Sequence, residues 1–254
     1  MMREPNLPPA YRLFRLDTVD STNAEAKRLA AKGEETAPDG ALVWALEQTA
    51  GRGRRGRKWQ SPRGNLYCSL ILRPDVPAEQ AAQLSFVGAL AACDALSALA
   101  PPGHMVQSKW PNDILLNGDK VGGLLLEAET GGDETPEWVI MGLGINVAEH
   151  PSKAAFPATS LKACGWTVSA VDSLEAFSRH FMIWANTWLD DGFAAIRKNW
   201  LWRCKGLGDK IEVRLADRTM KGIFKDIDQD GALVLKTGKR EHRITAGDVF
   251  FAAT

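Results

Sequence analysis

The stretch KWPNDILLNGDKVGGLLLE, residues 109–127, alternates apolar runs with turn signals and therefore predicts neighbouring strands of one β-sheet. Its turns are marked by Pro111-Asn112-Asp113 and by Asn117-Gly118-Asp119, residue types that favour tight reversals of the chain. Together with the apolar runs on either side, the expected strands cover residues 105–109, 113–117, 120–128 and 137–147.

Further elements are expected on both sides of this region. Apolar runs predict strands at 41–47 and 65–74, and the Ala/Leu-rich residues 78–100 predict a long helix that ends before Pro101. A second helix is expected over about 172–203. A third covers residues 24–32, with N-cap residue types at Ser21, Thr22 and Asn23 and with Gly33 as its C-cap.

The character of the sequence changes near residue 207. Helical stretches stop there, and short β-like runs with polar turns follow, which suits a small barrel of about 45 residues. We therefore expect a larger domain over residues 1–206 and a smaller one over residues 207–254.

Composition narrows the class of protein. The 254 residues carry 31 basic and 31 acidic side chains, and this balance argues against general binding of polyanions. We expect no membrane segment, because no stretch approaches the ~20 apolar residues that span a bilayer and no signal-peptide core is present. The four cysteines are far apart, so we expect no disulfide, no protein-bound metal and a cytoplasmic location.

The segment GRGRRGRKW, residues 51–59, places five positive charges on a glycine-rich piece of backbone. It matches G-x-G-x-x-G, but no helix is expected to begin within it, so we reject a dinucleotide fingerprint; a P-loop also fails, because Gly-Lys-Ser/Thr is missing. Three interpretations remain: a solvated charged loop, a nucleic-acid contact, or a clamp for the phosphates of a small ligand. With no opposing charge, we expect the loop to be poorly ordered until an anion binds.

The surroundings of this loop favour the phosphate clamp. Gln48 lies at the end of a buried strand, where ligand-orienting polar groups gather. Lys120 enters an apolar strand, where a lysine either meets an anion or extends to solvent. The glycines of that strand, like Gly142 and Gly144 further on, either mark bulges or leave room for a ligand. We expect these glycine-rich segments to line one cavity.

Three other residues have a structural interpretation beside the functional one. Trp59 either covers a purine or belongs to the core. Asn112 and Asp113 follow a proline in a turn, where Asn and Asp either hold the turn or reach a ligand.

Five motifs occur in order along the chain: DSTN (20–23), EQTAGRGRRGRKWQSP (47–62), NLYCSL (65–70), KWPNDILLNGDKVGGLLLE (109–127) and GLGINV (142–147). With these motifs, about residues 11–254 resemble the biotin–protein ligases, also called holocarboxylase synthetases. Five motifs in the family's order and spacing make the resemblance highly specific.

The resemblance implies an α+β fold. A catalytic domain of the class II synthetase-like biotin/lipoate ligase type, with helices around a mixed β-sheet, would be followed by a small SH3-like β-barrel. It also implies two reactions: biotin and Mg-ATP give biotinyl-5′-AMP and pyrophosphate, and a specific lysine of a carrier domain then takes the biotin and releases AMP. ATP would carry the Mg²⁺, so no metal site of the protein is implied.

The resemblance also assigns residues to roles. Catalytic roles are implied for Arg54, Lys120 and Asp113, of which Asp113 either helps to deprotonate the acceptor lysine or only fixes geometry. The implied biotin-binding residues are Ser21, Thr22, Asn23, Gln48, Arg52, Gly53, Arg54, Lys120, Gly122 and Gly123. The implied nucleotide-binding residues are Arg54, Arg55, Arg57, Lys58, Trp59, Lys109, Asn112 and Asn146.

The implied acceptor is the biotin carboxyl carrier domain of acetyl-CoA carboxylase or a related carboxylase, and a homodimer is compatible with the family. The DSTN motif starts at residue 20, which leaves no room for the DNA-binding domain of repressor relatives, so we expect no nucleic-acid binding. The last strand lacks the arginine that some relatives carry after Phe251, so a barrel contact with ATP stays open. The alternatives are a lipoate–protein ligase, a nucleic-acid-binding module and a biotin-binding protein without enzymatic activity.

Overall fold

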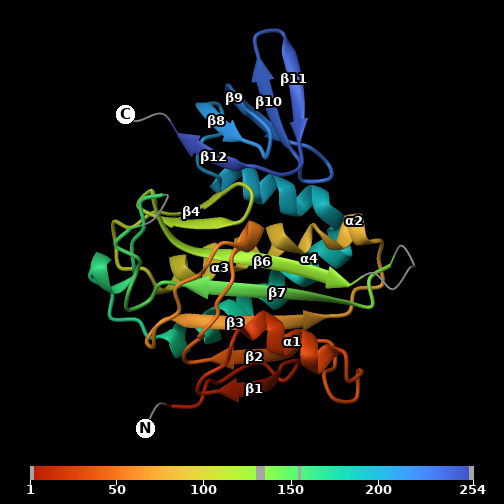
Figure 1. Cartoon of the computed structure of the whole chain (residues 1–254), viewed down its shortest axis with the longest axis vertical. Helices are drawn as coiled ribbons and strands as arrows, with labels where there is room; N and C mark the ends of the chain where they lie inside the picture. The colour runs from red at the N-terminus through yellow and green to blue at the C-terminus, as the bar shows by residue number, and fades with distance from the viewer. Residues whose placement is uncertain (1–2, 130–134, 154–155, 252–254) are drawn as a thin grey trace.

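The larger sheet of the molecule contains seven strands in the order β1-β2-β3-β7-β6-β5-β4 (Figure 1). The computed structural model describes residues 3–129, 135–153 and 156–251. The strands are β1 (Arg12–Leu16), β2 (Ala41–Ala45), β3 (Leu66–Leu72), β4 (Val106–Lys109), β5 (Asp113–Leu116), β6 (Asp119–Glu129) and β7 (Trp138–Ile145). β1 and β2 pair in parallel and the other neighbours are antiparallel, so the expected mixed sheet is confirmed.

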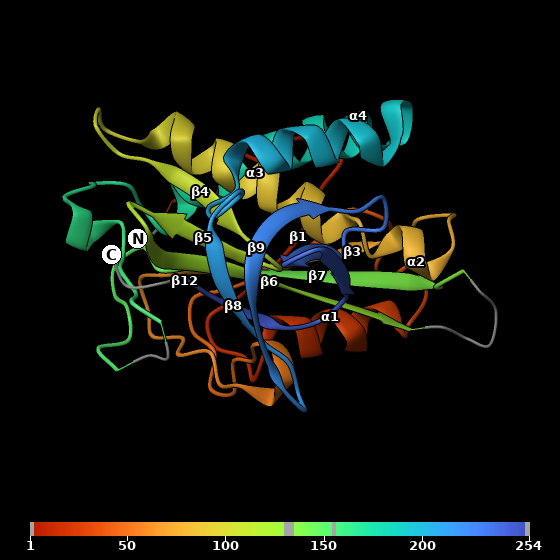
Figure 2. The ribbon, with the colours of Figure 1, turned by 90° about the horizontal axis from the view of Figure 1, so that it is seen from above.

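Helices cover both faces of this sheet. Figure 2 shows α3 and α4 together on one face and α1 on the other. The helices are α1 (Thr22–Ala30), α2 (Ala78–Ala81), α3 (Leu84–Leu99) and α4 (Ala170–Arg203), with single 3-10 turns η1 (Arg54–Gly56) and η2 (Lys162–Cys164). The main core lies between the sheet and the α3–α4 layer, because strands and helices turn their apolar side chains toward each other there.

The expected strands and helices are present, with three differences. β1 has no counterpart among the expected strands, because RLFRL mixes arginines with apolar residues at the edge of the sheet. The expected helix over 78–100 is divided by a turn at residues 82–83 into α2 and α3. α1 begins at Thr22, and its C-cap is Ala31 instead of Gly33.

One apolar stretch differs from what the composition led us to expect. The run Ala78–Leu99 is long and apolar enough to cross a membrane by length and composition alone. In the folded chain 61% of its apolar window is buried, and α3 packs against α4 and against the sheet. Its apolar surface is therefore that of a core helix.

α4 is the longest element and reaches from the first sheet to the second. It begins with a capping box, in which Ser169 Oγ accepts from the backbone N–H of Asp172 at 3.2 Å and the Asp172 carboxylate accepts from Ser169 N at 2.9 Å. Gly192 interrupts the helix with φ 71° and ψ −174°, a conformation that is nearly restricted to glycine. Beyond this kink, Arg197 donates to the carbonyl of Ile227 in the second sheet.

The second sheet, called the barrel below, follows α4 and lies at the top of Figure 1. Its five antiparallel strands have the order β11-β10-β9-β8-β12. They are β8 (Lys210–Arg214), β9 (Thr219–Ile227), β10 (Leu233–Thr237), β11 (Arg240–Ile244) and β12 (Asp248–Phe251). Trp110 Nε1 donates to the carbonyl of Gly231 at 3.1 Å, so a barrel turn is fixed beside the end of β4.

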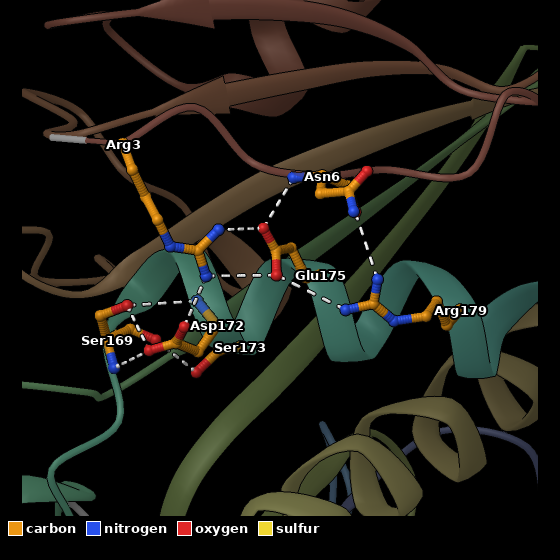
Figure 3. A network of polar contacts seen from close by, with 7 residues as sticks. All are labelled: Arg3, Asn6, Ser169, Asp172, Ser173, Glu175 and Arg179. Atoms are coloured by element: carbon orange, nitrogen blue, oxygen red, sulfur yellow. Dashed lines mark hydrogen bonds and ion pairs between the residues drawn. The ribbon is translucent and has the colours of Figure 1, made fainter.

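The N-terminal residues are held on the start of α4 (Figure 3). Arg3 pairs with Glu175 and, at 2.6 Å, with Asp172. Glu175 also accepts from the backbone N–H of Asn6 at 2.6 Å, and Arg179 donates to the Asn6 carbonyl at 3.2 Å. Glu175 is only 8% exposed, and its Arg3 partner is the main cause that lowers the pKa of its carboxyl.

Candidate active site

A pocket of about 360 Å³ lies over the glycines of β6 and β7, beside the N-terminus of α1. Its wall is completed by the basic loop (residues 51–59), by the turn between β4 and β5, and by the first residues of β12. Segments that are far apart in sequence, among them the segment after β7 with Lys153 and Phe156, and one strand of the barrel therefore meet at one cavity. The expectation that the glycine-rich segments line a common cavity is confirmed.

Glycines occur in the floor because a side chain at Gly142 or Gly144 would collide with residues that pack on β7. A Cβ at Gly142 would overlap the side-chain amide of Asn23, and a Cβ at Gly144 would lie 2.7 Å from Trp59 Nε1. Trp59 therefore packs against Gly144 of β7, and its indole N–H is buried without a hydrogen-bond partner in the described part of the chain. Gly122 is different, because a Cβ there would meet Ile145 and the carbonyl of Gly144 and not the pocket.

A chain of hydrogen bonds fixes the polar side chains at the α1 end. Gln48 Oε1 accepts from the backbone N–H of Thr22 at 2.8 Å, and Gln48 Nε2 donates to Ser61 Oγ at 2.8 Å. The buried Ser69 hydroxyl lies 2.8 Å from Thr22 Oγ1 and 2.6 Å from Asn23 Oδ1. These side chains are satisfied before any ligand arrives, so they present a fixed surface to it.

Glu127 links this chain of hydrogen bonds to the basic loop. Its carboxylate accepts from Asn23 Nδ2 at 2.8 Å and from Lys27 Nζ at 2.6 Å, and it lies 3.7 Å from Arg52. Burial raises the pKa of Glu127, but the lysine and amide contacts outweigh burial, so the pKa is lowered and the carboxylate stays charged. Ser21 caps α1 by position without a side-chain cap bond, which leaves its hydroxyl on the pocket wall.

Asp113 occupies the centre of the opposite wall. It pairs with Lys120 and lies 3.4 Å from Lys109 Nζ. Lys109 is 5% exposed and its ammonium stands 3.6 Å above the ring of Phe156; burial lowers its pKa. Lys120 Nζ also lies 5.4 Å from the centre of the Trp59 ring, so the pair Asp113–Lys120 faces the floor of the pocket.

The basic loop is folded as a narrow hairpin. Gly53 N donates to Arg57 O at 2.7 Å, and Trp59 N donates to Gly51 O at 2.9 Å. Arg54 turns inward, where its guanidinium lies 3.4 Å from Asn112 Oδ1 and burial lowers its pKa. At the tip, Arg55 adopts a positive φ of 55°.

The premise that nothing opposes the charges of this loop is wrong. Arg57 Nη2 donates to Asp248 Oδ1 at 2.7 Å, and Arg55 lies 3.5 Å from the other oxygen of the same carboxylate. The acidic partner comes from the barrel, which no local pattern in the sequence connects with residues 51–59. The expected disorder of the empty loop rested on that premise and stays an untested prediction, and the contacts with Asp248 argue against it.

Of the site residues expected from the sequence, the pocket wall contains all except Gly122 and Arg55. Gly122 serves backbone packing, and Arg55 extends from the hairpin tip toward Asp248. Asn146 lines the pocket while its amide donates to the carbonyl of Thr159 at 3.0 Å, which fixes the segment after β7. The sequence arguments missed Asp248, Val249 and Phe156, because only the folded chain brings these residues to the cavity.

Comparisons with known proteins agree with this geometry. The family model of the "Biotin/lipoate A/B protein ligase family" matches residues 7–202, and that of the "Biotin protein ligase C terminal domain" matches residues 206–252. The chain therefore belongs to the biotin/lipoate A/B protein ligase family and carries the C-terminal domain of biotin protein ligases.

Among individual relatives, a biotin–[acetyl-CoA-carboxylase] ligase of Paracoccus denitrificans is 42% identical over 93% of this chain and 99% of its own length. The bifunctional ligase/repressor BirA of Bacillus subtilis is 36% identical over 92% of this chain and 72% of its own length. The biotin protein ligase of Aquifex aeolicus in complex with biotin and ATP has a TM-score of 0.78 and 27% identity, covering 94% of this chain and 97% of that structure. The corresponding enzyme of Leishmania major with biotinyl-5-AMP has a TM-score of 0.64 and 25% identity, with 94% and 100% covered.

Proposed function

We propose that this chain is an ATP-dependent biotin–protein ligase, which activates biotin as biotinyl-5′-AMP and transfers it to a lysine of a carrier domain. The observation that carries the proposal is the pocket, in which cations from the basic loop, β4, β6 and the segment after β7 surround a glycine floor. The substrates of such a ligase are a carboxylate and a triphosphate, which require cations held in fixed positions. The 42% identity to a named ligase over nearly the whole chain supports the same activity.

In the first step, a carboxylate oxygen of biotin attacks the α-phosphorus of ATP. The bond from this phosphorus to the bridging oxygen breaks, and pyrophosphate leaves with the Mg²⁺ that ATP carries. We assign Lys120 and Arg54 to the carboxylate and the α-phosphate, because Asp113 orients the lysine and Asn112 lies beside the arginine. These cations offset the charge that builds up as two anions approach.

In the second step, the neutral amine of the acceptor lysine attacks the acyl carbon of the adenylate. The bond from the acyl carbon to the phosphate oxygen breaks, AMP leaves, and the nitrogen gives up a proton to solvent. Asp113 is our candidate near the reacting carbon, and its pairing with Lys109 and Lys120 favours an orienting role over proton transfer.

The two ends of the pocket suggest how the substrates lie. We place the ring system of biotin beside Thr22, Asn23 and Gln48, at the α1 end of the pocket. We place the nucleotide beside Arg57, Lys58, Trp59, Lys109 and Asn146, which also line the pocket. Among the described residues, no group of three His, Cys, Asp or Glu side chains could hold a metal ion, and Mg²⁺ enters this proposal only as part of its substrate.

We further propose that the acceptor is the biotin carboxyl carrier domain of a carboxylase, that residues 1–206 form the catalytic domain and that residues 207–254 form the barrel domain. Cytoplasmic location belongs to the same proposal, and the free thiols of Cys68, Cys93, Cys164 and Cys204 support it. The absence of nucleic-acid binding and the compatibility with a homodimer stay predictions.

Intact-mass spectrometry tests the proposal directly. The purified protein is mixed with Mg-ATP and a biotin carrier domain, with biotin in one arm and lipoate in the other. We expect an ATP-dependent, biotin-sized increase in mass on one carrier lysine. A lipoyl increase would keep the mechanism and overturn the substrate, and no increase in either arm with folded protein would overturn the ligase itself.

A further inference from the structure

The barrel contributes one carboxylate to the pocket wall. Asp248 is the first residue of β12, and its side chain is 20% exposed. Its two oxygens face the loop arginines: Oδ1 accepts from Arg57 Nη2 at 2.7 Å, and Oδ2 lies 3.5 Å from Arg55 Nη1. The preceding carbonyl, Gly247 O, lies 3.5 Å from Arg54 Nη1. Three arginines of the basic loop are thus turned toward the start of one barrel strand.

Asp248 is one of two acidic side chains in a described pocket wall that is mostly basic. The basic side chains in the described wall are Arg52, Arg54, Arg57, Lys58, Lys109, Lys120 and Lys153, and the acidic ones are Asp113 and Asp248. Asp113 is engaged by Lys120 and Lys109, on the wall opposite the biotin end. In the described wall, Asp248 is therefore the carboxylate that neutralises the basic loop.

A carboxylate and a phosphate compete for the N–H groups of an arginine guanidinium. Both present oxygens that a guanidinium binds with two parallel N–H groups, and the phosphate chain of ATP offers more oxygens and more charge than one carboxylate. A loop with several like charges and no counter-anion repels itself and loses its compact form. One contact can therefore keep the empty loop folded and still be replaced by phosphate.

We propose that Asp248 is a positioning residue that holds the basic loop on the barrel before nucleotide binds and releases Arg57 and Arg55 to the phosphates of ATP. This inference rests on the proposed function, because the competing anion is the nucleotide of the ligase reaction. The barrel then influences nucleotide affinity through charge competition, and its described residues in the pocket wall, Asp248 and Val249, include no basic side chain.

The test compares Asp248→Asn with Asp217→Asn, which removes the same charge from an exposed turn of the barrel. Two quantities are measured on the full chain: the rate of tryptic cleavage within residues 52–57 without ligand, and the Kd for ATP by calorimetry. Because partly exposed ion pairs are individually weak, we expect Asp248→Asn to be cleaved about threefold faster and to bind ATP about threefold more tightly. We expect Asp217→Asn to match the wild-type protein in both.

Further variants separate positioning from a purely structural role. Asp248→Glu keeps the charge, so we expect it to be cleaved as slowly as the wild-type protein and to have the wild-type Kd for ATP. If Asp248→Asn acted through a general folding defect, Asp248→Glu would show the defect as well. In Arg57→Gln protein, adding Asp248→Asn should change the Kd for ATP much less than in the wild-type background, because one competing pair is already gone. The KM for biotin should change less than the KM for ATP in every variant.

The opposite result overturns the inference. If Asp248→Asn weakens ATP binding, Asp248 supports the bound form of the loop and does not compete with phosphate; unchanged cleavage and unchanged Kd exclude any role in the loop. Failure of the proposed function is seen separately, because cleavage without ligand and binding of inorganic tripolyphosphate, used as a probe, do not depend on biotin transfer.

Discussion

At the scale of single residues, the site depends on glycines as much as on its polar side chains. Because Gly142 and Gly144 have no side chain, Asn23 and Trp59 can pack directly on β7. The motifs in the sequence identified nearly the whole wall, because each motif is a short segment whose residues stay together when the chain folds. The distinction between Gly122 and Gly123 could not be predicted, since neighbouring strand residues face opposite sides and the motif does not state which face is the pocket.

Gly142→Ala tests the glycine floor. The new methyl group would overlap the amide of Asn23, which Ser69 and Glu127 hold in place, so the strand or the amide must shift. We expect a loss of about 1–3 kcal/mol in the free energy of unfolding and a weaker Kd for biotin. Gly123→Ala is the matched control for stability, since its nearest contact would be 3.5 Å and we expect a loss below about 1 kcal/mol. Equal stability of the two variants in urea unfolding would contradict this account.

Arg54→Gly tests retention of the adenylate. The side chain closes the pocket between Asn112 and Gly247, and its removal opens a path for a reactive anhydride and for water. We expect adenylate formation, measured by the release of pyrophosphate, to remain detectable. Biotin should also appear on bystander lysines, which peptide mass spectrometry detects. Arg63→Gly, an exposed position of the same connection, serves as control. Labelling restricted to the carrier lysine in the Arg54 variant would rule out the closing role.

At the scale of elements, local periodicity predicted most strands and helices, because each carries its own apolar pattern. It did not predict β1, whose arginines Arg12 and Arg15 obscure the alternation at the sheet edge, nor the break between α2 and α3. It gave no sign of the kink at Gly192, because a lone glycine in a 34-residue helical pattern reads as a weak helix residue and not as an interruption.

Gly192→Ala tests the kink of α4. An added Cβ would meet no described atom within 4 Å, so the penalty comes from the backbone conformation at φ 71° and ψ −174°. We expect a loss of about 1–3 kcal/mol in the free energy of unfolding, measured by urea titration. Asp191→Ala, the exposed neighbour, should change stability by less than about 0.5 kcal/mol. A Gly192 variant as stable as the wild-type chain would mean that α4 can straighten without disturbing the barrel.

At the scale of the whole molecule, contacts between distant segments were beyond prediction from the sequence. Asp248 approaches Arg57 only because the barrel packs beside the first sheet, and Arg3 approaches Glu175 only because the N-terminal residues cross the start of α4. Such pairs have no spacing in the sequence that would reveal them. These pairs nevertheless attach the N-terminal residues to α4 and the barrel to the basic loop.

The tie at Glu175 predicts a dependence of stability on pH. The folded state lowers the pKa of Glu175, chiefly through Arg3, so the carboxylate stabilises the fold above the ordinary glutamate pKa and this stabilisation is lost as the pH falls through the lowered value. We expect wild-type protein to exceed Glu175→Gln in free energy of unfolding by roughly 1 kcal/mol at about pH 7, and the difference to shrink below about pH 4. Glu34→Gln, an exposed position, should show no such trend. A difference that stays constant across this pH range would refute the assignment.

The placement of α3 also has a consequence for synthesis of the chain. α3 ends at Leu99, whereas α4, which packs against it, is complete only at Arg203, about a hundred residues later. At roughly 5–20 residues per second, the ribosome leaves this apolar surface without its cover for on the order of 5–20 seconds. During that interval the nascent chain exposes a run that resembles a membrane span in length and composition. The rate of translation between the two helices therefore influences how much of the chain folds and how much chaperones must shield.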